Sequence, residues 1–328
     1  MPPEPILAVE RLRVEFPTRR GTLVAVHDVS FEIARGEVLG VVGESGAGKS
    51  ITGAAIIGLI DPPGRIAAGE IRLDGRRIDN LPPDRMRKVR GREIGAVFQD
   101  PLTSLNPLYT VGRQIVETIR THLPLGESEA RARAIALLEE VGIPAAERRI
   151  DHYPHQFSGG MRQRVVIALA LAAQPKLIIA DEPTTALDVS IQAQIIQLLK
   201  RLCRDHDAAV MLVTHDMGVI AETADRVAVM YAGRIVEVGP VADVIHRPRH
   251  PYTVGLMGSI PSIGATVERL AQIDGTMPRL DAIPDGCAFH PRCGRAIGRC
   301  RTGRPELVAL GSTSAACWVA DAADGAAP

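Results

Sequence analysis

This sequence has few aromatic residues and no excess of either positive or negative charge. Phe, Trp and Tyr make up 3% of its 328 residues, and 38 Lys and Arg are balanced by 38 Asp and Glu. A chain without net charge has no general electrostatic attraction for nucleic acid or an anionic membrane. Because 46% of the residues are hydrophobic, we expect a soluble globular protein with an ample core.

Long hydrophobic runs are missing as well. The longest apolar run, Val165–Ala173, is about half of the roughly 18 residues that a membrane-spanning helix needs. The N-terminal stretch MPPEPILAVERLRVEF lacks the apolar core of a secretory signal. We therefore expect the chain in the cytosol, where any membrane role is exercised through a partner.

Strand-like and helix-like segments alternate over the first 240 residues. Alternating patterns predict strands at Ile6–Phe16 and Ala25–Ile33, and the continuous apolar run Val38–Val42 predicts a buried parallel strand. Three further strand–helix units are predicted to begin with Leu177–Ala180, Val210–Val213 and Val227–Met230. This order predicts a mostly parallel sheet covered by helices. Periodicity fades near residue 240, where we place a domain boundary.

A phosphate-binding motif directly follows the apolar run at residues 38–42. The octapeptide GESGAGKS fits G-x-x-x-x-G-K-[ST], and a helical pattern begins there. Its residues are Gly43, Glu44, Ser45, Gly46, Ala47, Gly48, Lys49 and Ser50, followed by Ile51. Glycines let backbone N–H groups surround phosphates, the lysine reaches the β- and γ-phosphates, and the serine hydroxyl ligates Mg²⁺. The sequence therefore predicts binding of a nucleoside triphosphate.

Two further segments carry chemistry that suits a nucleotide. In KLIIADEP, four apolar residues precede Asp181, the expected Mg²⁺-shell carboxylate, and Glu182, the residue expected to polarise the attacking water. In HQFSGGMRQR, a serine and two glycines open an apolar helix. Backbone N–H groups at such a helix N-terminus bind anions, so the chain carries two candidate phosphate sites.

The order of these motifs resembles that of ABC-type ATPases. A phosphate loop, Gln99, SGG before a helix, ADEP, TTALD and VTHD follow one another within about residues 6–240. The resemblance implies an α/β P-loop NTPase (RecA-like) core with an antiparallel β-subdomain and a helical subdomain inserted at about residues 100–165. It also implies that Ser158, Gly159 and Gly160 of one subunit close on the γ-phosphate of an ATP held by the partner's phosphate loop.

The remaining site residues follow from the same resemblance. Gln99 would contact Mg²⁺ and the catalytic water, His215 would contact the γ-phosphate, and Asp188 would cross the dimer interface. Glu182, His215 and Gln99 are thus the expected catalytic residues of an ATP hydrolase.

One aromatic residue is expected to contact the adenine ring, and two residues differ from the usual signature of the family. Phe16 is expected to support the adenine ring, with an ordinary core phenylalanine as the alternative. The signature departs from the commonest form at Phe157, where leucine is usual, and at Met161, where glutamine is usual. The serine and glycines that would contact phosphate are intact.

Two segments narrow the resemblance to the dipeptide/oligopeptide branch of ABC importers, which includes nickel and glutathione importers. They are QDPLTSLNPLYTVGRQIVE, in which the part just after Gln99 would seat a coupling helix from each permease subunit, and HRPRHPYTVGLMGSIP. The implied partners are two permease subunits, an extracytoplasmic solute-binding protein and a second ATPase chain, a heterodimer being favoured over a homodimer. The chain would work at the cytoplasmic face of the membrane. The alternatives are an exporter ATPase, and a soluble ABC ATPase acting on DNA or ribosomes.

Cysteine is scarce, and four of the five cysteines lie in the irregular region predicted at residues 241–328. They are Cys287, Cys293, Cys300 and Cys317. A cytosolic location disfavours disulfides, whereas four thiolates suit zinc or a [4Fe–4S] cluster. The gaps of five, six and sixteen residues are wider than zinc knuckles, and nearby arginines would offset thiolate charge. We therefore expect a [4Fe–4S] cluster, with zinc or unligated thiols as alternatives; some peptide-importer ATPases carry such a cluster.

Overall fold

The computed structural model describes residues 4–185, 187–258 and 272–320. Contacts divide the chain into two compact units. The first unit comprises the chain up to Leu7, Ile33–Val38 and Arg72–Leu212. The second unit comprises Ala8–Glu32, Leu39–Ile71 and the chain from Val213 onward. Both units therefore combine segments that are far apart in the sequence.

The main strands lie close to the ranges predicted from hydrophobic patterning, and the helices intervene as expected. The strands are β1 (Leu7–Thr18), β2 (Gly21–Ile33), β3 (Val38–Val42), β4 (Arg65–Leu73), β5 (Arg76–Arg77), β6 (Ile94–Val97), β7 (Leu177–Asp181), β8 (Ala209–Val213), β9 (Arg226–Tyr231), β10 (Arg234–Pro240), β11 (Val308–Leu310) and β12 (Thr313–Ala315). The α-helices are α1 (Lys49–Ile56), α2 (Pro83–Val89), α3 (Pro101–Ser104), α4 (Val111–His122), α5 (Glu127–Glu140), α6 (Ala146–Arg149), α7 (Gly159–Leu171), α8 (Val189–Asp205), α9 (Met217–Thr223), α10 (Val241–His246), α11 (Pro251–Gly258) and α12 (Gly298–Thr302).

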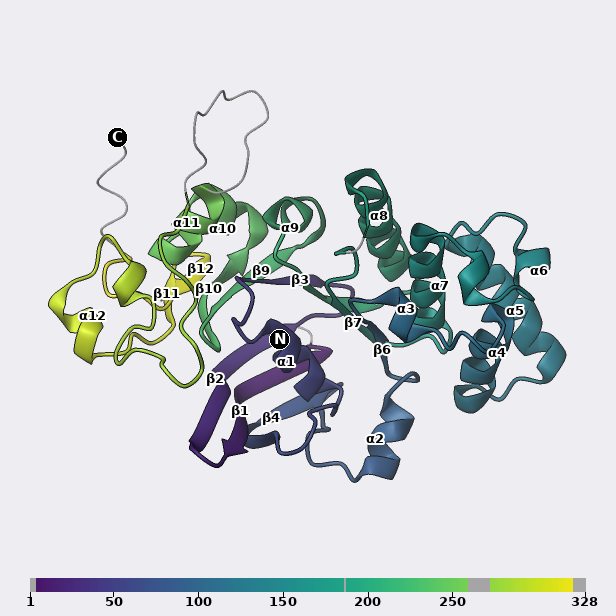
Figure 1. Ribbon diagram of the computed structural model, residues 1–328, viewed down its shortest axis with the longest axis horizontal. Helices are drawn as coiled ribbons and strands as arrows, with labels where there is room; N and C mark the ends of the chain where they lie inside the picture. Colours follow the sequence, from purple (N-terminus) through teal and green to yellow (C-terminus); the bar gives the residue numbers. More distant parts are fainter. Residues whose placement is uncertain (1–3, 186, 259–271, 321–328) are drawn as a thin grey trace. The chain divides into compact units, whose positions relative to one another are not determined.

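A strand layer of the second unit is formed by β2, β1 and β4, in that order, and Figure 1 shows these strands side by side. The buried positions of β1 do not alternate strictly, because Arg11 adopts a left-handed backbone with φ 44°. This irregularity faces Gly69 of β4, where a Cβ atom would lie 2.5 Å from the carbonyl oxygen of Arg11. Gly69 is thus the residue that lets β4 pass the irregular stretch of β1.

The other sheet region of the second unit has the order β11-β12-β10-β9-β3. Strand β9 pairs in parallel with β3 and antiparallel with β10. The C-terminal region, expected to be irregular, adds to this sheet, since β12 pairs with β10 through Glu237 opposite Ala315 and Val238 opposite Ser314. Three-residue strands separated by a two-residue turn carry too little periodicity to be recognised from the sequence.

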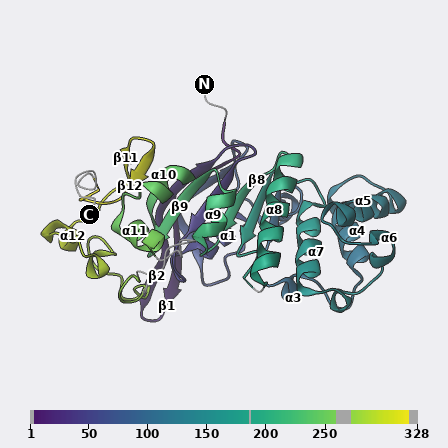
Figure 2. The ribbon, with the colours of Figure 1, turned by 90° about the horizontal axis from the view of Figure 1, so that it is seen from above.

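The first unit contains β8, β7 and β6 in that order, and β6 and β7 are parallel. Helices α4, α5 and α6 lie within residues 100–165, where a helical subdomain is expected, and α5 ends before Gly142, which has φ 79°. Helices α4, α5 and α7 pack on one another, as Figure 2 shows. Buried side chains recur every three to four residues along α4, at Val111, Ile115 and Ile119. This spacing directs one face of the helix into the packed layer.

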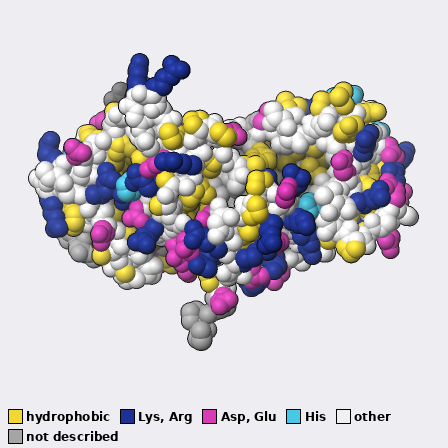
Figure 3. Space-filling model, turned by 90° about the horizontal axis from the view of Figure 1, so that it is seen from below, with side chains coloured by type: hydrophobic (Ala, Val, Ile, Leu, Met, Phe, Trp, Pro, Cys, Tyr) yellow, Lys and Arg dark blue, Asp and Glu magenta, His cyan; other side chains and the backbone are white. Residues whose placement is uncertain are grey.

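The surface mixes both signs of charge. Figure 3 shows Lys and Arg interspersed with Asp and Glu across the drawn face. Within the described ranges, no helix combines the length and the hydrophobicity needed to cross a membrane.

Candidate nucleotide-binding site

The phosphate loop joins β3 to α1 in the second unit. Its backbone requires glycine at two points: Gly48 caps α1 with φ 102°, and a Cβ atom on Gly43 would lie 2.2 Å from the carbonyl oxygen of Met230. Lys49 is 5% exposed, and its Nζ donates to the carbonyl oxygens of Gly43 (2.7 Å) and Glu44 (3.1 Å). The lysine charge is therefore held over the loop, where phosphate oxygens would replace these carbonyls as acceptors.

The turn between β9 and β10 supports the loop from one side. Gly233 donates its N–H to the carbonyl oxygen of Ala47 (2.9 Å), and its own carbonyl accepts the N–H of His27 (2.8 Å). Ala47 is fully buried, whereas Ser45 and Gly46 are exposed. The loop is thus fixed at its base and open at its tip.

Two residues of the C-terminal region hold the loop from another side, and neither was predicted. The hydroxyl of Tyr252 accepts the backbone N–H of Glu44 at 2.8 Å. The guanidinium of Arg292 donates to both carboxylate oxygens of Glu44 at 3.1 Å, with the arginine side chain only 7% exposed. A buried aromatic hydroxyl and a buried guanidinium therefore fix the first variable residue of the loop.

The HPYT segment is built to place Tyr252. Glu237 of β10 is fully buried and accepts the backbone N–H groups of Arg249 and His250 at 2.8 and 2.9 Å. His250 is 1% exposed, burial lowers its pKa to about 3, and its Nδ1 accepts the N–H of Tyr252 at 3.0 Å. The Tyr252 ring packs against those of Tyr231 and Phe289. The motif was visible in the sequence, but its contact with a loop 208 residues away was not.

In the first unit, Gln99 and Glu182 lie together. The Gln99 side-chain amide donates to Glu182 Oε2 at 3.1 Å, and the Thr185 hydroxyl donates to the same oxygen at 2.8 Å. Asp181 is the last residue of β7, and Glu182 follows in a left-handed conformation with φ 46°. A non-glycine residue in this conformation is uncommon, and such strain tends to occur at functional sites.

The signature turn lies at the N-terminus of α7, as predicted. Ser158 is the N-cap, and its hydroxyl accepts the N–H of Met161 at 3.4 Å. Ser158 and Gly159 are exposed, and a Cβ atom on Gly160 would lie 2.9 Å from Ile191 Cγ2 of α8. Phe157, the departure from the common signature, is 3% exposed and edge-on to His152, so it serves the core beneath the turn.

The remaining predicted site residues lie at or near helix N-termini, apart from Phe16 in β1. Asp188 is exposed at the N-cap of α8, and His215 is exposed between β8 and α9. Ser50 and Ile51 lie in the first turn of α1, where Ser50 is exposed. Phe16 is half-buried in β1, and its ring lies close to Gly64.

The four C-terminal cysteines border one enclosed space of about 10 Å³. All four are free thiols, and burial raises the pKa of Cys287 and Cys293, and that of Cys317 to about 11. The described residues contain no group of three or more His, Cys, Asp or Glu side chains placed to hold a metal ion. The structure thus brings the thiols together without presenting a formed metal site.

The arginines expected to offset thiolate charge are mostly engaged elsewhere. Arg292 pairs with Glu44, and Arg299 stacks on Trp318 at 3.5 Å from the ring centroid. The Arg304 side chain donates to the carbonyl oxygen of Gly286 at 3.1 Å. Burial raises the pKa of Cys293, and the neighbouring Arg295 lowers it by a smaller amount.

Comparisons with known proteins agree with this arrangement. Residues 26–185 match the ABC transporter family, and residues 236–300 match the oligopeptide/dipeptide transporter C-terminal region. The chain is 48% identical over 302 residues to the dipeptide transport ATP-binding protein DppD of Escherichia coli (strain K12), which covers 92% of each chain. It is 52% identical over 294 residues to the oligopeptide transport ATP-binding protein OppD of Bacillus subtilis (strain 168), with 89% of this chain and 82% of that relative covered.

Solved structures give the same result. The dimeric ATP-binding cassette MJ0796, solved in a post-hydrolysis state bound to ADP and Pi, shares 31% identity and a TM-score of 0.64. The match covers 72% of this chain and 98% of that one. The chain therefore belongs to the ABC transporter family of ATP-binding proteins, and the resemblance seen in the motif order is confirmed.

Proposed function

We propose that this chain is the ATP-hydrolysing subunit of an ABC importer for di- or oligopeptides. The observation that carries the proposal is the extent of the similarity. It spans 92% of the chain in a dipeptide transport relative, and a second match at residues 236–300 lies beyond the cassette. The HPYT segment and three of the four C-terminal cysteines fall within this second match.

The catalytic roles follow the motif positions. Lys49 would bind the β- and γ-phosphates, and Ser50, Asp181 and Gln99 would hold Mg²⁺. Glu182 would orient the attacking water, and the Gln99 amide and Thr185 hydroxyl on its Oε2 support this role by fixing one carboxylate oxygen. His215 would contact the γ-phosphate, and Phe16 would support adenine.

The second candidate phosphate site, the serine–glycine turn at the start of α7, would bind the nucleotide of a partner subunit. Ser158 and Gly159 are exposed at the start of α7, a helix of 13 residues, and Asp188 is exposed at the start of α8. Helix N-termini with exposed N–H groups favour phosphate. ATP would then be enclosed between two head-to-tail ATPase subunits, and we propose that the second is a different chain.

We propose that the four C-terminal cysteines, Cys287, Cys293, Cys300 and Cys317, bind a [4Fe–4S] cluster, with zinc as the alternative. The donor set supports it, since four thiols border one space and thiolates are the ligands of both groups. That space is small, so loading would move the surrounding loops apart. Either group would be structural. Protein purified without oxygen should contain iron and absorb at about 400 nm; a colourless, iron-free protein rules the cluster out.

The transport partners complete the proposal. Two permease subunits would dock near the segment that follows Gln99, and an extracytoplasmic protein would deliver the solute. The ATPase would act at the cytoplasmic face, with its cassette at residues 1–240, a helical subdomain at about 100–165 and a C-terminal domain at 241–328.

Reconstituted transport tests the function directly. The chain, its companion ATPase and the permeases encoded beside it would be placed in vesicles together with the solute-binding protein. We expect ATP-dependent uptake of labelled peptides and none with Glu182→Gln in both ATPase chains. Uptake of nickel without peptides, or ATP hydrolysis unchanged by Glu182→Gln, would contradict the proposal.

A further inference from the structure

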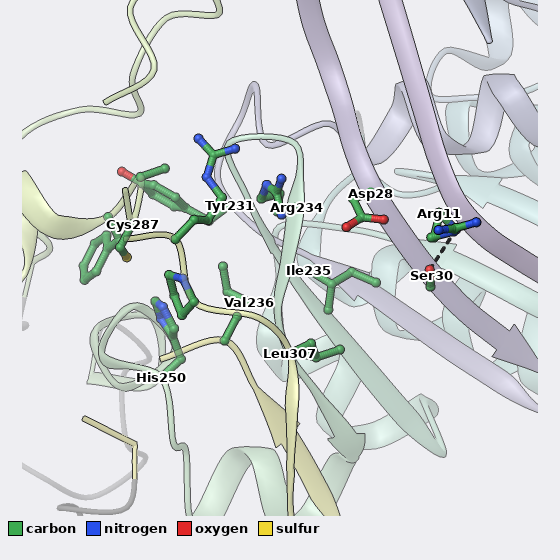
Figure 4. Close-up of a pocket in the computed structure, with 15 residues that line it drawn as sticks. Arg11, Asp28, Ser30, Tyr231, Arg234, Ile235, Val236, His250, Cys287 and Leu307 are labelled. Atoms are coloured by element: carbon green, nitrogen blue, oxygen red, sulfur yellow. Dashed lines mark hydrogen bonds between the residues drawn. The ribbon is translucent and has the colours of Figure 1, made fainter. Parts of the chain in front are cut away.

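A cavity of about 270 Å³ lies in the second unit beside the β9–β10 turn. Its wall is formed by side chains of β1, β2, β9 and β10 together with the segments around Cys287 and Pro305, as Figure 4 shows in part. None of the residues assigned to nucleotide binding lines it. Its volume lies just below the roughly 300–1,000 Å³ of pockets for drug-sized ligands.

One end of the cavity carries an arginine that forms no ion pair with a carboxylate of the described residues. Arg234 is half-buried, and its guanidinium donates to His27 Nδ1 at 2.6 Å. Burial, and then the charge of Arg234, lower the pKa of His27, so this acceptor is neutral. Burial and the neighbouring Arg304 lower the pKa of Arg234 to about 10. No carboxylate among the described residues forms an ion pair with Arg234, so a half-buried cation lacks the counter-ion that such groups normally have.

A single acidic residue faces the same cavity. Asp28 of β2 is exposed, has a left-handed backbone with φ 59°, and lies between Arg234 and Arg11 in the view of Figure 4. Its charge acts on Arg234 from beyond ion-pair distance. The cavity therefore presents one acid and three arginines, Arg11, Arg234 and Arg304, with space between them.

The rest of the wall is apolar. Ile235, Val236 and Phe289 are buried, and Leu307 lies at the mouth with 39% exposure. Small-molecule sites have this composition, a mostly apolar lining with a few charged groups that fix orientation.

We propose that this cavity binds a small zwitterion with an apolar side chain, a free amino acid or a dipeptide. Its carboxylate would lie between Arg234 and Arg304, its ammonium group at Asp28, and its side chain against Val236 and Phe289. The choice of a peptide as ligand rests on the proposed transport function, which would deliver peptides to this side of the membrane. The charges and the apolar wall are independent of that function.

Residues that line the cavity also contact, or directly adjoin, residues that hold the phosphate loop in place. Tyr231 lines the cavity, and its hydroxyl accepts from Arg292 at 3.4 Å, the residue paired with Glu44. Arg234 directly follows Gly233, whose N–H holds Ala47. A ligand in the cavity should therefore change the affinity of the chain for ATP. Because coupling between two binding sites is reciprocal, ATP should change the affinity for that ligand by the same factor.

Calorimetric titration of the full-length chain, purified without oxygen, tests the site. The probes are alanyl-leucine, its C-terminal amide and its N-acetyl form. We expect the dipeptide to bind, and each blocked form to bind about 10- to 100-fold more weakly, the range expected for a lost hydrogen bond to a charged group. Arg234→Met should weaken the dipeptide by a similar factor yet leave the amide unaffected, since the amide has no carboxylate for Arg234 to hold.

Two exposed positions keep the test valid if Arg234→Met does not fold. Arg304→Met should weaken the dipeptide, and Asp28→Asn should remove the preference for a free ammonium group. The matched control is Arg148→Met, an exposed arginine of α6 in the first unit. No binding at millimolar dipeptide, or binding unchanged by Arg234→Met, Arg304→Met and Asp28→Asn, overturns the site.

A second titration, of ATP with and without saturating dipeptide, tests the coupling. A changed ATP affinity supports it, and an unchanged affinity overturns it. These outcomes are separable from the proposed function, because a chain that binds dipeptide here yet powers no peptide uptake in vesicles keeps the site and loses the transport assignment.

Discussion

Tyr252 and Glu44 connect the C-terminal region to the phosphate loop through a single hydroxyl. The bond reaches the backbone, so it constrains the loop whatever side chain occupies position 44. Nucleotide binding depends on the loop N–H groups being held in a cradle before the phosphates arrive. Tyr252 is therefore a positioning residue for nucleotide binding.

Tyr252→Phe should weaken ATP binding about 5- to 10-fold, the lower part of the range expected when a buried donor loses its partner. The ring still fills its place between Tyr231 and Phe289, so the folded chain should remain intact. Equilibrium titration of ATP measures the effect. Tyr153→Phe, at an exposed tyrosine, is the control; equal effects of the two variants would contradict the assignment.

Arg292 and Glu44 should behave as a coupled pair. A double-mutant cycle with Arg292→Met and Glu44→Gln is expected to give an interaction energy of about 1 kcal/mol in ATP binding, because the pair is largely shielded from solvent. Arg292→Lys should recover only part of the loss, since a lysine cannot also donate to the backbone carbonyl oxygens of Asp274 and Gly275 that hold the guanidinium in place. Additive effects of the two single changes would show that the contact has no role in ATP binding.

For single residues, the sequence predicts roles that depend on neighbours in the chain but not contacts between residues far apart in the chain. The phosphate loop and the acids at the end of β7 were found because the chemistry of each is contained in eight or fewer consecutive residues. Tyr252 was noticed within HPYT, but its partner lies 208 positions away, and no pattern in one sequence reports such a contact. The arginines near the cysteines were expected to offset thiolate charge, and the structure instead pairs one of them, Arg292, with Glu44.

Among the elements, helix α7 has two tasks at its first residues. Ser158 caps the helix, and the exposed turn formed with Gly159 and Gly160 is proposed to meet a partner's γ-phosphate. The two tasks are separable by charge, because aspartate caps helices as well as serine does, whereas a carboxylate repels phosphate.

Ser158→Asp should therefore leave thermal stability within about 0.5 kcal/mol of the parent while abolishing ATP-driven association. Ser158→Ala should lower stability by about 1 kcal/mol through loss of the cap. Thermal unfolding and ATP hydrolysis by the assembled subunits measure the two effects. Full hydrolysis by the Ser158→Asp protein would contradict the role given to this turn.

Asp74 links three segments of the first unit, because its carboxylate accepts from Lys176 and Arg35. The hydrogen bond from Lys176 is the main cause of the lowered pKa of Asp74. A carboxyl whose pKa is lower in the folded state contributes stability above its unfolded pKa, and that contribution is lost as the pH falls through the folded value.

Asp74→Asn should lower the free energy of unfolding at pH 7 by less than about 1 kcal/mol, since the pair is partly exposed and screened. The difference from the parent should shrink as the pH falls below about 4. Denaturant unfolding at several pH values measures this. Asp84→Asn, at a carboxylate that is 89% exposed, is the control; a difference that does not change with pH would show that the loss comes from something other than this charge.

Element boundaries were predictable where one pattern persists and unpredictable where it breaks. Strand β3 was placed at Val38–Val42 because the run is continuously apolar, and the structure buries all five residues. The break in β1 at Arg11 depends on Gly69, which is far away in the chain. Strands β11 and β12 depend on β10 for their existence, so no local signal announces them.

At the scale of the whole molecule, the other assignments depend on one arrangement of two subunits around ATP. We propose that the chain binds ATP in its phosphate loop and that the serine–glycine turn of a companion subunit completes the site. The family assignment supports this geometry, and a related cassette has been solved as a dimer. A protein of this kind should associate when ATP is present and hydrolysis is blocked.

Sedimentation of the Glu182→Gln protein with Mg-ATP, alone and mixed with its companion ATPase, measures this most directly. We predict a complex of two ATPase subunits that forms with ATP, is absent with ADP, and is lost when Ser158→Asp is present in both chains at the matching positions. A sample that sediments as single subunits under every one of these conditions would contradict it.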